Sequence, residues 1–189
     1  MSAFFLSFGV IFVAELGDKS QLMALAFAAR YRALPVLVGI TAATAVVHAV
    51  SVGVGALLGA ALPTHAINVV AGIAFLGFAA WTLRGDELSE DEEARATRRG
   101  RNAVVAASGA FFLAELGDKT MLATITLAST EGLVGTWAGS TLGMVAADAI
   151  AIGLGKLLGT RLPENVIRIG AAVLFVVFGI VLIVEGLAS

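Results

Sequence analysis

Six long apolar runs constrain the fold of this chain more than any other feature. They cover about residues 3–29, 35–61, 65–83, 103–128, 133–160 and 163–187. About 20 apolar residues in a helix cross the roughly 30 Å hydrocarbon core of a bilayer, and a single segment in lipid satisfies its own backbone hydrogen bonds only as a helix. The mean hydropathy of +0.96 and the charged fraction of 14% agree with a membrane setting. We therefore expect an all-α membrane protein with six transmembrane helices.

A duplicated hexapeptide lies within the first and fourth runs. Glu-Leu-Gly-Asp-Lys-Ser at 15–20 recurs one hundred residues later as Glu-Leu-Gly-Asp-Lys-Thr at 115–120. The Gly and Leu pattern of 53–63 recurs at 153–163 with the same offset. We predict two three-helix repeats, 1–83 and 103–189, joined by a linker loop at 84–102. An odd number of helices in each repeat inverts the second repeat relative to the first, as in many transporters.

Basic residues predict the orientation. If the helices alternate in direction, the first, third and fifth connections share one side of the membrane. That side holds Arg30, Arg32, Arg84, Arg95, Arg98, Arg99, Arg101 and Arg161, and the connections on the other side hold no Lys or Arg. Since cytoplasmic loops are enriched in Lys and Arg, we expect a cytoplasmic linker loop and both termini outside.

Four carboxylates of the duplicated motif, Glu15, Asp18, Glu115 and Asp118, lie inside predicted spans. A carboxylate at the bilayer centre costs roughly 2.5 to 3.5 kcal/mol on insertion scales, so four of them indicate a compensating role, most simply a bound cation. We expect Gly17 and Gly117 to break their helices and to free backbone carbonyls as further oxygen ligands.

The motif lysines, Lys19 and Lys119, are predicted to be internal counter-ions. Lys19 lies four residues after Glu15, where the two side chains of a continuous helix can pair. Four carboxylates and two lysines leave a net charge of −2, which one divalent cation or two protons neutralise, and a site that must be neutral to reorient then predicts exchange. The alternative is that the ion pairs only lock the two halves together. The surplus of two carboxylates argues against this alternative.

Several neighbouring polar residues are candidate auxiliary ligands or parts of a proton path. The hydroxyls of Ser20 and Thr120 either serve the cation or bond back to the carbonyl four residues earlier. Gln21 is a candidate for tuning selectivity, although its counterpart Met121 fits ordinary packing. His48 and Asp148 occupy equivalent positions at mid-helix, and their alternative role is interhelical hydrogen bonding.

Other functional classes are disfavoured by the sequence. With no cysteine there is neither a disulfide nor a thiolate metal site, and a net charge of −2 gives no nucleic-acid-binding footprint. No feature indicates a resident cofactor. Paired acids also occur in intramembrane aspartyl proteases, but that chemistry leaves the Lys after each Asp unexplained. We therefore expect no enzyme activity.

The duplicated E-L-G-D-K-[ST] motif resembles the signature of a known family. This family comprises small membrane proteins with two E-x-G-D-[KR]-[ST] motifs, including the Golgi manganese and calcium transporter of animals and yeast, and it is linked to the lysine-exporter superfamily. Bacterial relatives of similar length are manganese exporters. The resemblance covers essentially the whole chain. It implies antiport of Mn²⁺ or Ca²⁺ against protons, with Glu15, Asp18, Glu115 and Asp118 as metal ligands, in a bacterial inner membrane.

Together these features predict a secondary transporter that exports Mn²⁺ in exchange for protons. Oxygen donors suit Mg²⁺, Ca²⁺ and Mn²⁺ alike, and the absence of Cys argues against Zn²⁺ and Cu⁺. The expected mechanism is alternating access around a midplane site, with one half rocking against the other. The alternatives are a Ca²⁺/proton antiporter of the same architecture and a passive divalent-cation channel. The expected partners are the metal ion, protons and membrane lipid.

Overall fold

The computed structural model describes residues 2–84, 90–91, 94, 102–158 and 164–188, and the elements of this part are helices. The predicted linker loop lies largely outside the described residues, and Arg161 lies outside them as well. The helices are α1 (Ser2–Glu15), α2 (Lys19–Arg30), α3 (Ala33–Ala61), α4 (Thr64–Arg84), α6 (Ala103–Glu115), α7 (Lys119–Thr130), α8 (Leu133–Leu158) and α9 (Glu164–Ala188).

Four of these helices are long and apolar enough to cross a membrane. They are Ala33–Ala61, Thr64–Arg84, Leu133–Leu154 and Arg168–Ala188, and α1 and α6 are shorter apolar helices. Large apolar side chains cover the outer faces, as Leu57 (72% exposed), Val134 (78%) and Leu187 (75%) illustrate. Exposed apolar surface of this extent is a liability in water and suits contact with lipid. The all-helical, apolar architecture agrees with the sequence.

The first and fourth predicted runs are each divided into two helices, at the glycines that were expected to break them. α1 ends at Glu15 and α2 begins at Lys19, while α6 ends at Glu115 and α7 begins at Lys119. In the breaks, Gly17 has a φ of 77° and Gly117 a φ of 81°. This left-handed conformation costs other L-residues roughly 1–2 kcal/mol but is open to glycine. Each glycine therefore ends one helix before the motif aspartate begins the next.

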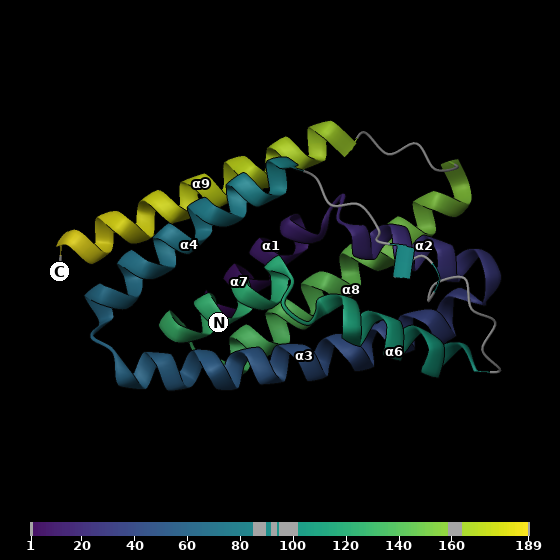
Figure 1. Cartoon of the computed structure of the whole chain (residues 1–189), viewed down its shortest axis with the longest axis horizontal. Coiled ribbons are helices and arrows are strands. Elements are labelled where there is room, and N and C mark those ends of the chain that lie inside the picture. The colour runs from purple at the N-terminus through teal and green to yellow at the C-terminus, as the bar shows by residue number, and fades with distance from the viewer. Residues whose placement is uncertain (1, 85–89, 92–93, 95–101, 159–163, 189) are drawn as a thin grey trace.

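The helices form a bundle that is elongated along one axis (Figure 1). α4 and α9 run side by side along one long edge, and α3 runs along the opposite edge. The α2–α3 connection and the start of α6 lie at one end of the long axis. The α3–α4 turn, the α7–α8 turn and the C-terminus lie toward the other end.

Helices from the two halves of the chain pack on one another through glycine. α1 packs against α8, and α6 against α3. A Cβ added at Gly139 would lie 2.3 Å from the Phe4 carbonyl oxygen, and one added at Gly39 would lie 2.7 Å from the Val104 carbonyl oxygen. Small residues at these points allow the backbones to approach closely, as is usual between membrane helices. The second contact repeats the first with each residue shifted by one hundred.

Residues one hundred positions apart also touch each other at the centre of the molecule. The Thr44 hydroxyl donates to the Met144 sulfur at 3.3 Å. The rings of Phe75 and Phe175 lie with their centroids 5.8 Å apart, in the interface where α4 packs on α9. The core is thus built jointly by the two parts of the chain that carry the duplicated motif.

Candidate metal centre

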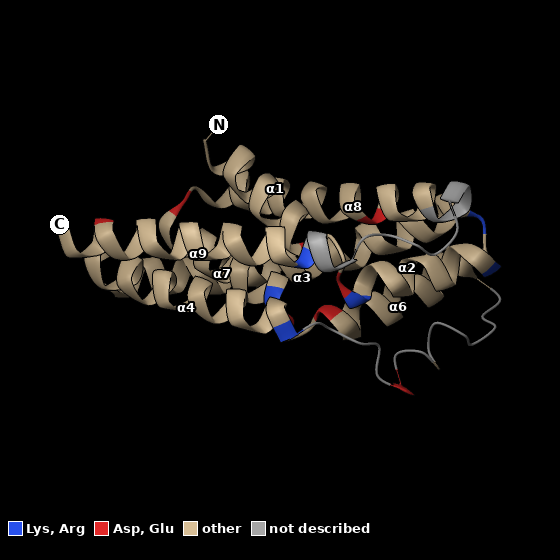
Figure 2. Cartoon of the chain, turned by 90° about the horizontal axis from the view of Figure 1, so that it is seen from above, with Lys and Arg blue, Asp and Glu red and all other residues tan. Residues whose placement is uncertain are grey.

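The four motif carboxylates are buried at the two helix breaks. Glu15 and Glu115 are the last residues of α1 and α6, and Asp18 and Asp118 are the N-caps of α2 and α7. Their exposed fractions are 0% for Glu15 and 1% to 3% for the others. Figure 2 shows helices that are almost wholly uncharged, with acidic and basic segments gathered midway along the molecule and at the helix ends. Buried charges of this kind require partners or a bound ion.

Each motif lysine pairs with the aspartate of the other motif. Lys119 Nζ bonds to Asp18 Oδ1, and Lys19 Nζ lies 3.5 Å from Asp118 Oδ1. The expected pairing of Lys19 with Glu15 is therefore replaced by a pairing across the two motifs, because the break at Gly17 removes the helical register on which that expectation depended. The two pairs differ in burial, since the side chain of Lys119 is 3% exposed and that of Lys19 is 19% exposed.

The motif hydroxyls hold the motif glutamates. Ser20 Oγ donates to Glu15 Oε1 and also lies 3.2 Å from Asp18 Oδ2. Thr120 Oγ1 donates to Glu115 Oε2 at 2.8 Å. The sequence left open whether these hydroxyls serve the cation site or bond back to the preceding helical turn. They bond to the motif carboxylates and not to backbone carbonyls. Each glutamate keeps its other oxygen, Glu15 Oε2 or Glu115 Oε1, buried and without a hydrogen bond.

The residue after each motif hydroxyl caps the exposed amide of the glycine. Gly17 N–H donates to Gln21 Oε1 at 2.9 Å, and Gly117 N–H donates to the Met121 sulfur at 3.2 Å. Gln21 Nε2 in turn donates to the Ala147 carbonyl oxygen at 3.2 Å, which ties α2 to α8. Sequence reasoning missed this capping role. The sequence feature that could have indicated it is a side chain with a hydrogen-bond acceptor, Gln21 or Met121, four residues after the glycine at which the helix was expected to break.

Asp148 and His48, the equivalent pair on α8 and α3, are both fully buried. Neither carboxylate oxygen of Asp148 has a hydrogen-bond partner, and Asp148 interacts electrostatically with Asp18, Glu15 and Glu115. His48 Nδ1 lies 3.4 Å from the Thr141 hydroxyl, which matches the interhelical alternative for this residue. The structure therefore brings Asp148 to the motif acids and joins His48 to α8.

The donor atoms of this centre suit a hard cation. Its side chains offer carboxylate and hydroxyl oxygens, and oxygen ligands are preferred by Mg²⁺, Ca²⁺ and Mn²⁺. Within the described part of the chain, no three His, Cys, Asp or Glu side chains stand close enough together to hold a metal ion as they lie. The lysines hold Oδ1 of Asp18 and of Asp118, so a cation that binds these two atoms must replace the lysine ammonium groups.

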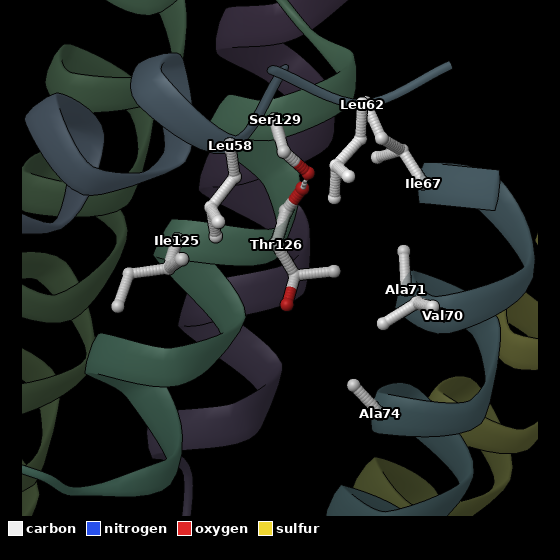
Figure 3. A pocket seen from close by; sticks show the side chains of 9 residues that line it. All are labelled: Leu58, Leu62, Ile67, Val70, Ala71, Ala74, Ile125, Thr126 and Ser129. Atoms are coloured by element: carbon white, nitrogen blue, oxygen red, sulfur yellow. Dashed lines mark hydrogen bonds between the residues drawn. The ribbon is translucent and has the colours of Figure 1, made fainter. Parts of the chain in front are cut away.

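An apolar pocket between α3, α4 and α7 is separate from this centre (Figure 3). Its polar lining consists of the Thr126 and Ser129 hydroxyls, which donate to the Leu122 and Thr126 carbonyls of their own helix. The remaining lining residues are Leu58, Leu62, Ile67, Val70, Ala71, Ala74 and Ile125. With no carboxylate in its lining, this pocket offers no ligand set for a cation.

Comparison with known proteins identifies the family of this chain. The family model described as "Divalent cation/proton antiporter GDT1" matches residues 3–90 and 103–189. A "Putative manganese exporter" of Vibrio cholerae is 36% identical over 183 residues, covering 95% of this chain and 90% of the relative. A GDT1-like protein of Synechocystis is 33% identical, covering 96% of both chains. The chloroplastic protein PAM71 of Arabidopsis thaliana is 32% identical, covering 97% of this chain and 57% of its own length.

No solved structure matches the chain. The family resemblance expected from the duplicated motif is confirmed by the family model, which covers nearly the whole chain. The chain belongs to the GDT1 family of divalent cation/proton antiporters, which are membrane transporters rather than enzymes.

Proposed function

We propose that this protein exports Mn²⁺ from the cytoplasm in exchange for protons, with Glu15, Asp18, Glu115 and Asp118 as the cation ligands. One observation carries the proposal. Two acidic motifs, one from each half of the chain, meet in a buried centre, where each lysine neutralises the aspartate of the other motif. The centre therefore accepts positive charge, which the ammonium groups of Lys19 and Lys119 supply in this structure.

Charge balance supports exchange over passive flow. The four motif carboxylates and two lysines sum to −2 when all are ionised. Moving an uncompensated charge through a low-dielectric interior is costly, so the site reorients readily only when a dication or two protons cover this surplus. Such a centre moves one Mn²⁺ one way and two protons the other. A passive channel has no need for this restriction.

The lysines act in this scheme as tethered substitutes for the cargo. When Mn²⁺ arrives, the Lys119 and Lys19 side chains leave Asp18 and Asp118, and the aspartates turn to the metal. When protons neutralise the glutamates, the lysines return and the metal is released. Ser20 and Thr120 hold Glu15 and Glu115 in place throughout, because their hydroxyls donate to one oxygen of each glutamate and leave the other oxygen free.

The proposed topology is two inverted repeats with both termini outside. The first broken run consists of α1 with 14 residues and α2 with 12. The second consists of α6 with 13 residues and α7 with 12. At 1.5 Å per residue each pair provides about 37 to 39 Å of helix, enough to cross once as a broken helix. The matched contacts of Gly39 and Gly139, and of Phe75 with Phe175, support a two-fold relation between the repeats.

The packing favours moving parts other than the two halves. Each half packs mainly on the other half, so rocking one half against the other would break most of these contacts. α4 and α9, by contrast, pack on each other far more extensively than on the remaining helices. We therefore propose that the α4–α9 pair moves as one body against the helices that hold the motifs, and this replaces the rocking of halves expected from sequence.

Mn²⁺ is the proposed cargo because the donors are oxygens and because a relative that covers 95% of this chain is named as a manganese exporter. The same oxygen donors also suit Ca²⁺, which makes a Ca²⁺/proton antiporter the second candidate. The two ions differ in size, and Ca²⁺ takes six to eight ligands at longer distances. Competition of Ca²⁺ against Mn²⁺ transport separates the two.

Transport in proteoliposomes tests the proposal. With an acidic lumen and Mn²⁺ outside, we expect uptake that accelerates with the pH gradient and stops when an ionophore collapses it. Glu15→Gln and Asp118→Asn should abolish this uptake, whereas the control Glu131→Gln, in the α7–α8 connection, should retain it. Uptake that ignores the pH gradient would favour the channel. Unchanged uptake by Glu15→Gln would refute the site.

A further inference from the structure

The two repeats differ chemically where they face the motif acids. Asp148 stands at the position equivalent to His48, and Gln21 at the position equivalent to Met121. Gln21 lies next to the helical turn that carries Asp148, because Gln21 Nε2 bonds to the carbonyl of Ala147, the residue before Asp148. The repeats therefore differ at two equivalent positions, with a carboxylate and an amide at Asp148 and Gln21 and an imidazole and a thioether at His48 and Met121.

Asp148 is a buried acid that the protein scaffold leaves without partners. Its exposed fraction is 0%, and neither Oδ1 nor Oδ2 makes a hydrogen bond. Buried side-chain oxygens in folded proteins nearly always have a partner, so a carboxylate with two free oxygens calls for a ligand. The motif lysines do not supply it, because both are directed to Asp18 and Asp118.

Asp148 also lies within electrostatic range of the motif acids. It interacts electrostatically with Asp18, and with Glu15 and Glu115 in turn. Glu15 Oε2 and Glu115 Oε1 are likewise buried and free of hydrogen bonds. Carboxylates gather in a buried region only if a bound cation or protons neutralise their charge.

Gln21 holds this arrangement in register. Its amide oxygen accepts from Gly17 N–H in the break between α1 and α2, and its amide nitrogen donates to Ala147 on α8. One side chain thus fixes the turn that carries Asp148 against the break that carries Glu15 and Asp18. On the other side Met121 caps Gly117 through sulfur.

We propose that Asp148 supplies a fifth carboxylate to the transported divalent cation, with Gln21 as the positioning residue that holds Asp148 against the first motif. The inference rests on the proposed function. It makes the cation site asymmetric, with more carboxylate ligands on the side of Glu15 and Asp18 than on the side of Glu115 and Asp118. With Asp148 ionised the formal charge of the centre is −3, so one proton stays in the centre when the dication is bound. The exchange remains two protons for one Mn²⁺.

Mn²⁺ binding to the purified full-length protein, measured by calorimetry in detergent, tests this assignment. We expect Asp148→Asn to weaken Mn²⁺ binding at least tenfold and Asp148→Glu to recover part of the loss. The matched control His48→Asn, at the equivalent position of the other repeat, should change the dissociation constant less than twofold. Asp148→Asn with wild-type affinity, or His48→Asn with an equal loss, would overturn the proposal.

A second pair of variants exchanges residues that the chain already accepts at equivalent positions. Gln21→Met should weaken Mn²⁺ binding several-fold, and Met121→Gln should not. If Gln21 acts through Asp148, Gln21→Met has no further effect when combined with Asp148→Asn, whereas a general structural role would give an additional loss. Additive losses would overturn the positioning role. If Asp148→Asn fails to fold, the single variants still test the proposal, because equal Mn²⁺ affinities of Gln21→Met and Met121→Gln would overturn it.

The outcomes separate this inference from the proposed function. If the wild-type protein binds no Mn²⁺, or if Glu15→Gln binds it unchanged, both the function and the inference fall. If the wild-type protein binds Mn²⁺, Glu15→Gln loses it and Asp148→Asn keeps it, only the inference falls.

Discussion

Replacing Lys119 by Met tests the idea that a lysine stands in for the cargo. Met has a similar volume without the charge, so Lys119→Met leaves Asp18 buried without the ammonium group that bonds to it. Asp18 is 1% exposed and Lys119 is 3% exposed. Breaking a buried ion pair by removing one partner costs about 3 to 5 kcal/mol. At roughly 2–4 °C per kcal/mol for a chain of this size, the metal-free variant should melt about 6 to 20 °C lower than the wild type.

Lys19→Met provides the matched control. Its pair with Asp118 is longer, at 3.5 Å, and the Lys19 side chain is 19% exposed. An exposed pair contributes up to about 1 kcal/mol and a buried one at least about 3 kcal/mol, so the loss for Lys19→Met should fall between these values. We therefore predict that Lys19→Met loses less stability than Lys119→Met.

Added Mn²⁺ should reverse the loss in Lys119→Met. The metal no longer competes with the lysine for Asp18, so its affinity rises, and Mn²⁺ at 100 times its dissociation constant stabilises the folded state by about 2.7 kcal/mol. Thermal unfolding in detergent with and without Mn²⁺ measures both effects, and transport by the variant should slow because nothing displaces the metal. A metal-free variant as stable as the wild type, or one that Mn²⁺ stabilises no more than the wild type, would refute the reasoning.

Three further predictions address the helix breaks, the packing and the coupling. Gly117→Ala should cost about 1–2 kcal/mol of stability, because the φ of this residue is +81°. Nothing lies within 4 Å of the added Cβ, so the cost comes from the backbone alone. Its control Gly109→Ala, which is helical and has equal space, should gain about 0.5–1 kcal/mol. Gly139→Ala places Cβ 2.3 Å from the Phe4 carbonyl oxygen and should cost about 1–3 kcal/mol. Gly9→Ala, helical and with nothing within 4 Å, should gain about 0.5–1 kcal/mol. Equal melting temperatures within either pair would contradict the structure. If two protons compete with each Mn²⁺, the binding constant from calorimetry should fall up to about a hundredfold per unit decrease in pH, and a pH-independent constant would contradict the exchange.

The helices outside the motifs were predictable from sequence because apolar runs in lipid have few structural options. The runs expected at 35–61 and 65–83 correspond to Ala33–Ala61 and Thr64–Arg84, and those at 133–160 and 163–187 to Leu133–Leu158 and Glu164–Ala188. The breaks at Gly17 and Gly117 were expected from glycine before Asp. Their extent was not expected, since hydropathy does not reveal that Leu16 and Asp18 also leave the helix.

The pairing of each motif lysine with the aspartate of the other motif could not be predicted from the sequence. Helical spacing placed Lys19 beside Glu15, and this inference holds only where the helix continues. Once it breaks, the partner of Lys19 depends on how the two halves meet, which is a long-range property. The same limit applies to the packing of α1 on α8 and of α4 on α9, because this packing is not encoded in any local pattern.

The central claim is that one divalent cation binds between the two motifs. An anomalous-scattering map of the protein crystallised with Mn²⁺ tests it most directly. The account predicts a single manganese peak enclosed by Glu15, Asp18, Glu115 and Asp118, with the lysine side chains withdrawn from the aspartates. A manganese peak elsewhere in the molecule, with both lysine–aspartate pairs intact, would contradict it.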